Sequence, residues 1–81
     1  MKGGNAGVFV YMSYDELTPD QKLQVKQRYM MKLADEGNFV EVMYGGGEER
    51  GPSYGELADA DRLVPDDVVR DGTMYTEEDF T

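Results

Sequence analysis

Two short segments of the chain are almost continuously apolar, and a longer segment between them repeats its apolar residues with a helical period. The segment from Val8 to Tyr14 (VFVYMSY) is rich in β-branched and aromatic residues, which favours a strand. Both of its faces are largely apolar, so it is either a covered central strand or a strand that pairs with a partner. The segment from Phe39 to Tyr44 (FVEVMY) has a similar composition and is the second predicted strand.

The region between these strands predicts a long amphipathic helix from about Pro19 to Glu36. Thr18 suits the N-cap, Pro19 suits the first helical position, and Gln21 completes a capping box. Gly37 suits a left-handed C-cap that ends the helix. At about 100° per residue, the apolar residues form one stripe, widened on one side: Leu23, Met30, Leu33 and Ala34, with Tyr29 and Val25. The helix also carries half of the basic residues, and their charges point around several faces: Lys22, Lys26, Arg28 and Lys32.

Shorter elements are predicted after the second strand. The run from Gly45 to Pro52 breaks regular structure and predicts a flexible, glycine-rich loop. Ser53 and Glu56 form a second capping box, which predicts a helix of about eight residues. Its inward residues should be Leu57 and either Ala58 or Ala60. Pro65 suits the first turn of one more short helix.

Together these elements predict an α+β fold in a single small domain, residues 1–81. Two strands pack with one long amphipathic helix (about 19–36), and short helices and an acidic tail follow. The strand, helix and strand form either a βαβ-like unit or two antiparallel strands with the helix laid across them. Residues 1–7 are expected to be a flexible N-terminus, 45–52 a glycine-rich loop and 53–81 an acidic C-terminal segment.

The composition excludes much of enzyme chemistry. The chain has no His and no Cys, so the usual catalytic triads, thiol nucleophiles and His- or Cys-ligated zinc sites are absent. The pair Asp59 and Asp61 suggests a calcium loop, but Leu63 and Val64 occupy positions that need a ligand and a glycine. An 81-residue chain also has little volume for a deep active-site pocket. We therefore expect a non-enzymatic protein with no catalytic residues, no metal site and no cofactor.

The net charge of −9 narrows the class of partner. Nucleic acids and anionic membrane surfaces attract basic proteins, so direct binding to either is not expected. The longest nearly apolar run, from Val8 to Met12, is too short to span a bilayer, and no signal peptide is recognisable. These features predict a cytoplasmic protein that binds something basic.

The charge is concentrated in the C-terminal part of the chain. Residues 1–47 carry six acidic and five basic residues, whereas residues 48–81 carry eleven acidic and three basic ones. Acidic residues commonly serve solubility alone, but this segregation is one-sided for that purpose. The candidate partner-binding residues are Glu48, Glu49, Glu56, Asp59, Asp61, Asp66, Asp67, Asp71, Glu77, Glu78 and Asp79.

These acidic residues are suited to imitating DNA. Duplex DNA presents one negative charge per roughly 1.7 Å of axis. Carboxylates two residues apart on a strand lie about 6.6 Å from each other, and those four apart on a helix lie about 6 Å apart, so they can imitate successive phosphates. A basic groove built for DNA would attract such a surface.

Two segments resemble a group of small acidic proteins of phages and bacterial mobile elements that includes anti-CRISPR inhibitors, particularly of type I systems. They are LTPDQKLQVKQRYMMKLADEG (Leu17 to Gly37) and PSYGELADADRLVPDDVVRDGTMYTEEDF (Pro52 to Phe80), which together cover 50 of the 81 residues. The resemblance implies a stoichiometric inhibitor in the bacterial host cell that blocks target-DNA or PAM recognition by a Cas effector. A type I Cascade subunit is favoured over Cas9 as the target.

Two alternatives stay open at this point. One is an antitoxin-like regulator of another basic nucleic-acid-binding protein, which shares the acidic surface and differs only in its partner. The other is a phage or plasmid accessory protein that forms a homodimer through the aromatic strand. A charge introduced at Val10 or Tyr11 should disrupt such a dimer.

Overall fold

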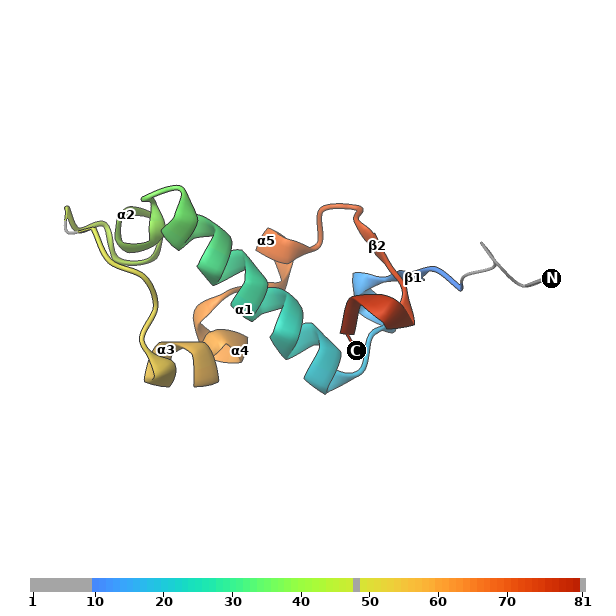
Figure 1. The fold of residues 1–81 in the computed structure, drawn as a ribbon. Coiled ribbons are helices and arrows are strands. Elements are labelled where there is room, and N and C mark those ends of the chain that lie inside the picture. Colours follow the sequence, from blue (N-terminus) through green and yellow to red (C-terminus); the bar gives the residue numbers. More distant parts are fainter. Residues whose placement is uncertain (1–9, 48, 81) are drawn as a thin grey trace, which may run out of the picture.

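The computed structural model describes residues 10–47 and 49–80, and its fold belongs to the α+β class, as the sequence predicts. One long helix, α1 (Pro19–Asp35), runs through the middle of the molecule (Figure 1). Short elements surround it in chain order: β1 (Met12–Ser13), η1 (Tyr14–Glu16), α2 (Phe39–Tyr44), α3 (Tyr54–Ala58), α4 (Ala60–Leu63), α5 (Asp66–Val69), β2 (Met74–Tyr75) and η2 (Glu77–Phe80). The β1–β2 pair lies near the N-terminal end of α1, and α2 lies at its C-terminal end.

Helix α1 begins and ends at the predicted caps. The backbone N–H of Gln21 donates to the Thr18 Oγ1 at 3.2 Å, and the Thr18 N–H donates to the Gln21 Oε1 at 3.0 Å. At the other end, Gly37 adopts a φ of 77°, and its N–H donates to the Ala34 carbonyl at 3.0 Å. Only a residue without a Cβ adopts that backbone conformation at no cost, so a glycine is needed at this position.

The prediction of a strand at Phe39 to Tyr44 is wrong, because this segment is the helix α2. Its buried residues, Phe39 and Val40, belong to the same core cluster as Met43, four residues after Phe39 and three after Val40, which are helical spacings. Gly45 ends the helix with a φ of 71°. The preference of β-branched and aromatic residues for strands depends on a sheet to join, and packing against α1 replaces that sheet here.

The first predicted strand is shorter than expected. Only Met12 and Ser13 form β1, and the chain enters η1 at Tyr14. Val10 and Tyr11 are exposed, whereas Val8 and Phe9 lie outside the described residues. The strand is short because β2 pairs with only these two residues before the chain turns into η2.

The partner of β1 is β2, which comes from the segment expected to be an acidic tail. Met12 lies opposite Tyr75 and Ser13 lies opposite Met74 in an antiparallel register. Met74 and Tyr75, which lie in the predicted acidic segment, therefore pair with the strand near the start of the described residues. The arrangement also selects antiparallel over parallel pairing, although with a different second strand from the one predicted.

The predicted eight-residue helix after Ser53 is two helices, α3 and α4, separated at Asp59. The second capping box is confirmed: the Glu56 N–H donates to the Ser53 Oγ at 3.2 Å, and the Ser53 N–H donates to the Glu56 Oε1 at 2.8 Å. The bend at Asp59 turns Ala60 fully inward and leaves Ala58 exposed. Pro65 directly precedes α5 and occupies its N-cap rather than its first helical position.

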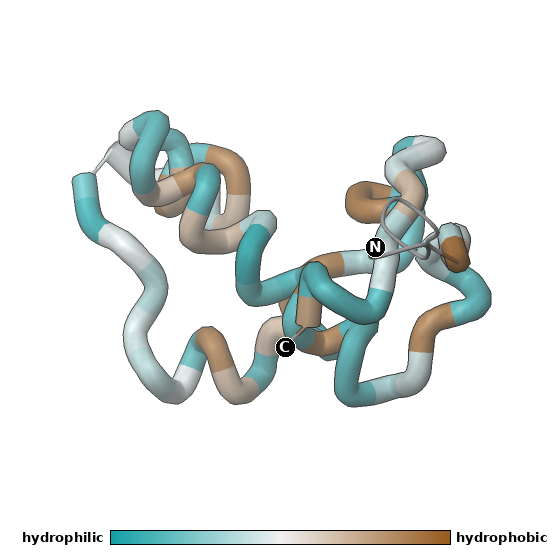
Figure 2. Tube along the Cα trace, turned by 45° about the vertical axis from the view of Figure 1, so that its right-hand side comes forward, coloured by the Kyte–Doolittle hydropathy of each residue, from teal (hydrophilic) through white to brown (hydrophobic). Residues whose placement is uncertain are grey.

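The hydrophobic core lies between α1 and the elements that cover it. Its largest fully buried side chains are Phe39, Met30 and Val64, from α2, from α1 and from the turn after α4. Figure 2 shows apolar and polar residues interleaved along the trace. In the part of the chain that the structure describes, no helix is long and apolar enough to cross a lipid bilayer.

Candidate functional site

The candidate site is built around Lys26, a buried cation in the middle of α1. Its side chain is 4% exposed, and the ammonium group reaches three oxygen atoms. The Asp61 carbonyl accepts at 2.9 Å, the Asp66 Oδ1 lies at 3.0 Å and the Asp61 Oδ1 at 3.5 Å. The burial of this charge is therefore offset by one hydrogen bond to a carbonyl and by two ion pairs, with residues of α4 and α5.

Asp66 contacts both Lys26 and the buried residue Tyr14. The same Oδ1 that contacts Lys26 accepts a hydrogen bond from the Tyr14 hydroxyl at 2.7 Å. The Tyr14 hydroxyl and the Lys26 ammonium hold the pKa of the Asp66 carboxyl below its usual range. Burial, together with the bond to Asp66, raises the pKa of the Tyr14 hydroxyl far above its usual value. Asp66 is therefore an ionised acceptor and Tyr14 a protonated donor near neutral pH.

A second cation, Arg70, holds two more carboxylates beside the first pair. Its Nη2 lies 2.9 Å from the Asp15 Oδ1, and its Nη1 lies 3.2 Å from the Asp67 Oδ1. Its guanidinium also lies over the Tyr14 ring, 5.9 Å from the centroid. Residues 55 apart in sequence, Asp15 and Arg70, thus meet through the packing of η1 against the end of α5.

We name this arrangement the Lys26–Arg70 cluster. Its members are the carboxylates of Asp15, Asp61, Asp66 and Asp67, the cations of Lys26 and Arg70, and the Tyr14 ring. Four acids face two bases, so the cluster keeps an excess of negative charge. The carboxylates remain accessible while the ammonium of Lys26 is buried: the side chain of Asp61 is 79% exposed and that of Asp67 is 93% exposed.

Glu56 occupies a different environment at the far end of the molecule. Its two carboxylate oxygens accept from Arg50 at 2.7 and 3.1 Å, and the Tyr44 hydroxyl donates to one of them. These contacts and the Ser53 backbone N–H hold the pKa of the Glu56 carboxyl far below its usual value. One acid is matched by one base here, and the Glu56 side chain is only 16% exposed. The Glu56 carboxylate is therefore engaged by its own chain, unlike the exposed acids of the Lys26–Arg70 cluster.

The remaining predicted residues are spread over other surfaces. Asp59 forms an ion pair with Arg62 at 3.0 Å. Asp71 accepts a hydrogen bond from the Thr73 N–H at 3.1 Å in the turn after α5. Glu77, Glu78 and Asp79 lie on η2, Glu49 is exposed in the loop before α3, and Glu48 lies outside the described residues. Of the eleven predicted acids, the structure brings Asp61, Asp66 and Asp67 together in the cluster.

Sequence reasoning missed Asp15, Lys26 and Arg70 as parts of the site. Lys26 had a detectable signal, because it lies three residues after Leu23 and four before Met30, inside the apolar stripe of α1. A lysine in that position is either buried with partners or disruptive. Asp15 had no such signal, since its contact with Arg70 depends on how η1 is placed.

The centre of the cluster is filled by cations rather than left open for a metal. Among the described residues, no group of three or more acidic side chains is arranged to hold a metal ion. What the arrangement offers chemically is a set of carboxylate acceptors at fixed positions, able to receive Lys or Arg side chains of another molecule.

Comparison with known protein families, with characterised proteins and with solved structures finds no match to this chain.

Proposed function

We propose that this protein is a stoichiometric, non-catalytic inhibitor that occupies the nucleic-acid-binding surface of a basic protein. The Lys26–Arg70 cluster carries the proposal, because its acids outnumber its bases and remain exposed. A surface that receives phosphates uses Lys and Arg side chains, and carboxylates at suitable spacing accept the same hydrogen bonds.

Preorganisation supports this role. A flexible acidic tail loses side-chain freedom when it binds, which reduces affinity. In the cluster, Lys26 and Arg70 already hold the carboxylates against α1 and α5, so less freedom remains to be lost. The protein's net charge of −9 adds long-range attraction toward a basic partner. The expected result is fast association that weakens as salt is added.

The resemblance to anti-CRISPR proteins suggests which partner to test first. We propose a Cas effector, a type I Cascade subunit before Cas9, bound where it reads target DNA and the short PAM beside it. The immobilised protein should retain the effector complex at low salt and release it at high salt. Duplex DNA carrying the target should compete with the protein for the effector.

Two triple variants that lose the same charge distinguish an effect of the cluster's position from an effect of the protein's total charge. The cluster variant combines Asp15→Asn, Asp61→Asn and Asp67→Asn, and the control combines Asp20→Asn, Glu36→Gln and Glu41→Gln at exposed positions elsewhere. Both lose three negative charges. We expect the cluster variant to bind the effector at least roughly tenfold more weakly and the control no more than about threefold more weakly.

Three results would contradict parts of the proposal. Equal losses in the two variants would mean that net charge alone matters and that the cluster is not the contact surface. Retention of another basic protein instead of the effector would favour the antitoxin-like alternative. If no partner is retained at either salt concentration, the inhibitor proposal itself is wrong.

A further inference from the structure

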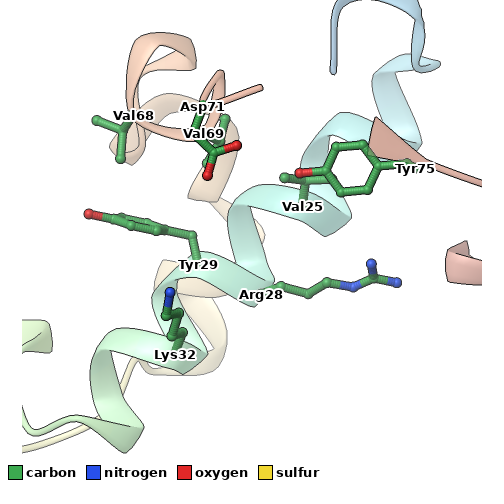
Figure 3. Close-up of a pocket in the computed structure, with 8 residues that line it drawn as sticks. All are labelled: Val25, Arg28, Tyr29, Lys32, Val68, Val69, Asp71 and Tyr75. Carbon is green, nitrogen blue, oxygen red and sulfur yellow. The ribbon is translucent and has the colours of Figure 1, made fainter. Parts of the chain in front are cut away.

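A groove of about 220 Å³ lies on a different side of α1 from Lys26, between α1, α5 and β2 (Figure 3). Its floor is apolar, because Val25 and Val69 are both buried beneath it. The rings of Tyr29 and Tyr75 flank this floor. The groove is therefore a small hollow with aromatic walls, which is suited to an apolar group the size of a side chain.

Two opposite charges border the groove without pairing. Lys32 lies on α1, and Asp71 lies in the turn after α5 with its carboxylate directed into the groove in Figure 3. Within the described residues, no ion pair joins Lys32 to any carboxylate. The Thr73 hydrogen bonds, and the charge of Lys32 nearby, keep the pKa of the Asp71 carboxyl below its usual range, so Asp71 is ionised near neutral pH.

The third charged group that lines the groove, Arg28, is engaged by the protein itself. The Arg28 guanidinium donates to the Asp79 carbonyl and lies over the Phe80 ring, 4.9 Å from the centroid. Burial raises the pKa of the Tyr75 hydroxyl, which therefore stays protonated and can donate or accept a hydrogen bond. Lys32 and Asp71 are then the charged groups most available to a ligand.

We propose that this groove binds a small zwitterion with an apolar body, such as an aromatic α-amino acid, with its ammonium group on Asp71 and its carboxylate on Lys32. The apolar side chain would lie over Val25 and Val69 between the two tyrosine rings. A ligand with one charge fits less well, because a carboxylate alone also faces Asp71 and an ammonium group alone also faces Lys32. This site is independent of the Lys26–Arg70 cluster and of any protein partner.

Titration of the isolated protein with L-phenylalanine, followed by amide NMR shifts, tests this proposal. We expect saturable shifts around Val25, Val69 and Tyr75 at millimolar ligand. Phenylpropionate lacks the ammonium group, phenethylamine lacks the carboxylate, and glycine lacks the apolar body. Each of the three should bind at least roughly tenfold more weakly than L-phenylalanine.

Variants assign the contacts. Lys32→Gln and Asp71→Asn should each weaken L-phenylalanine binding by roughly tenfold, the loss expected for one charge-assisted hydrogen bond. Lys22→Gln and Asp20→Asn make the same charge changes on the first turns of α1, away from the groove, and should leave binding unchanged. Far-UV circular dichroism verifies that all four variants fold. The absence of saturable shifts, equal binding of phenylpropionate, or equal losses in the control variants would each overturn the proposal.

Discussion

The two carboxylate networks of this protein, one around Lys26 and the other around Glu56, differ in which charge is enclosed. In the Lys26–Arg70 cluster the cation of Lys26 is buried, and the acids around it reach solvent. At Glu56 the acid is enclosed by Arg50, Tyr44 and the Ser53 backbone. The first network keeps an excess of negative charge at the surface, and the second is balanced and largely covered.

The acidic residues of the C-terminal segment are therefore not equivalent. A carboxylate whose oxygens are all engaged by its own chain has little to offer a partner. A carboxylate that shares a buried cation with a neighbour is held in position and still exposes acceptors. The comparison separates acids that stabilise the fold from acids available for binding.

The largest effect is expected from Lys26→Met. The substitution removes the ammonium group from a buried position and leaves the Asp61 carbonyl and the Asp66 carboxylate without it. Breaking a buried ion pair costs about 3–5 kcal/mol. Since water reaches the carboxylates here, we expect the free energy of unfolding to fall by about 2–3 kcal/mol, measured by urea denaturation.

Lys22→Met is the matched control for this variant. Lys22 lies one turn earlier on α1, with its Nζ 5.5 Å from the centroid of the Tyr14 ring. Among the described residues, Lys22 forms no ion pair. Its replacement should lower the free energy of unfolding by less than about 1 kcal/mol. Equal losses in the two variants would mean that Lys26 is no more important to the fold than Lys22, a half-buried lysine.

A smaller effect is expected from Glu56→Gln, and it should depend on pH. The pKa of the Glu56 carboxyl is lower in the folded state than in the unfolded state, so the unfolded state binds the proton more readily. Its contribution to stability is present above the usual glutamate pKa of about 4.3 and is lost as the pH falls through the folded-state value. Glu56→Gln should therefore destabilise the protein at pH 7 and lose less stability on acidification than the unchanged chain.

Urea denaturation from neutral pH down to about pH 3 measures this difference. Glu41→Gln removes the same charge from an exposed position on α2 and serves as the control. An acid dependence of Glu56→Gln identical to that of the unchanged chain would show that the Arg50 and Tyr44 contacts do not hold the carboxylate in solution.

The smallest effect on stability is expected from the cluster variant that neutralises Asp15, Asp61 and Asp67. Exposed ion pairs contribute about 0–1 kcal/mol each, and removing like charges relieves repulsion in an acidic surface. The free energy of unfolding should change by no more than about 1 kcal/mol, measured by urea denaturation. A larger loss of unfolding free energy would mean that these acids, like Glu56, stabilise the fold rather than bind a partner.

The segment from Phe39 to Tyr44, predicted as a strand, is a helix in the structure. Its composition favours a strand, yet its burial pattern in the structure is helical. Conversely, Met74 and Tyr75 are predicted to lie in an acidic tail but form a strand. Its only described partner is a two-residue segment far away in sequence. Such short elements take their conformation from the surface on which they pack.

Interactions between residues a few positions apart could be predicted from the sequence. These are the capping box of α1, its glycine C-cap and the capping box of α3. The concentration of acidic residues after residue 47 is likewise a property of the sequence. Tertiary packing determines which strand pairs with β1, which oxygen atoms surround the Lys26 ammonium group, and that Asp15 meets Arg70. Those contacts join residues 35 to 63 positions apart, from Lys26 with Asp61 to Met12 with Tyr75. No local pattern encodes them, because they depend on how α4, α5 and η1 are placed around α1.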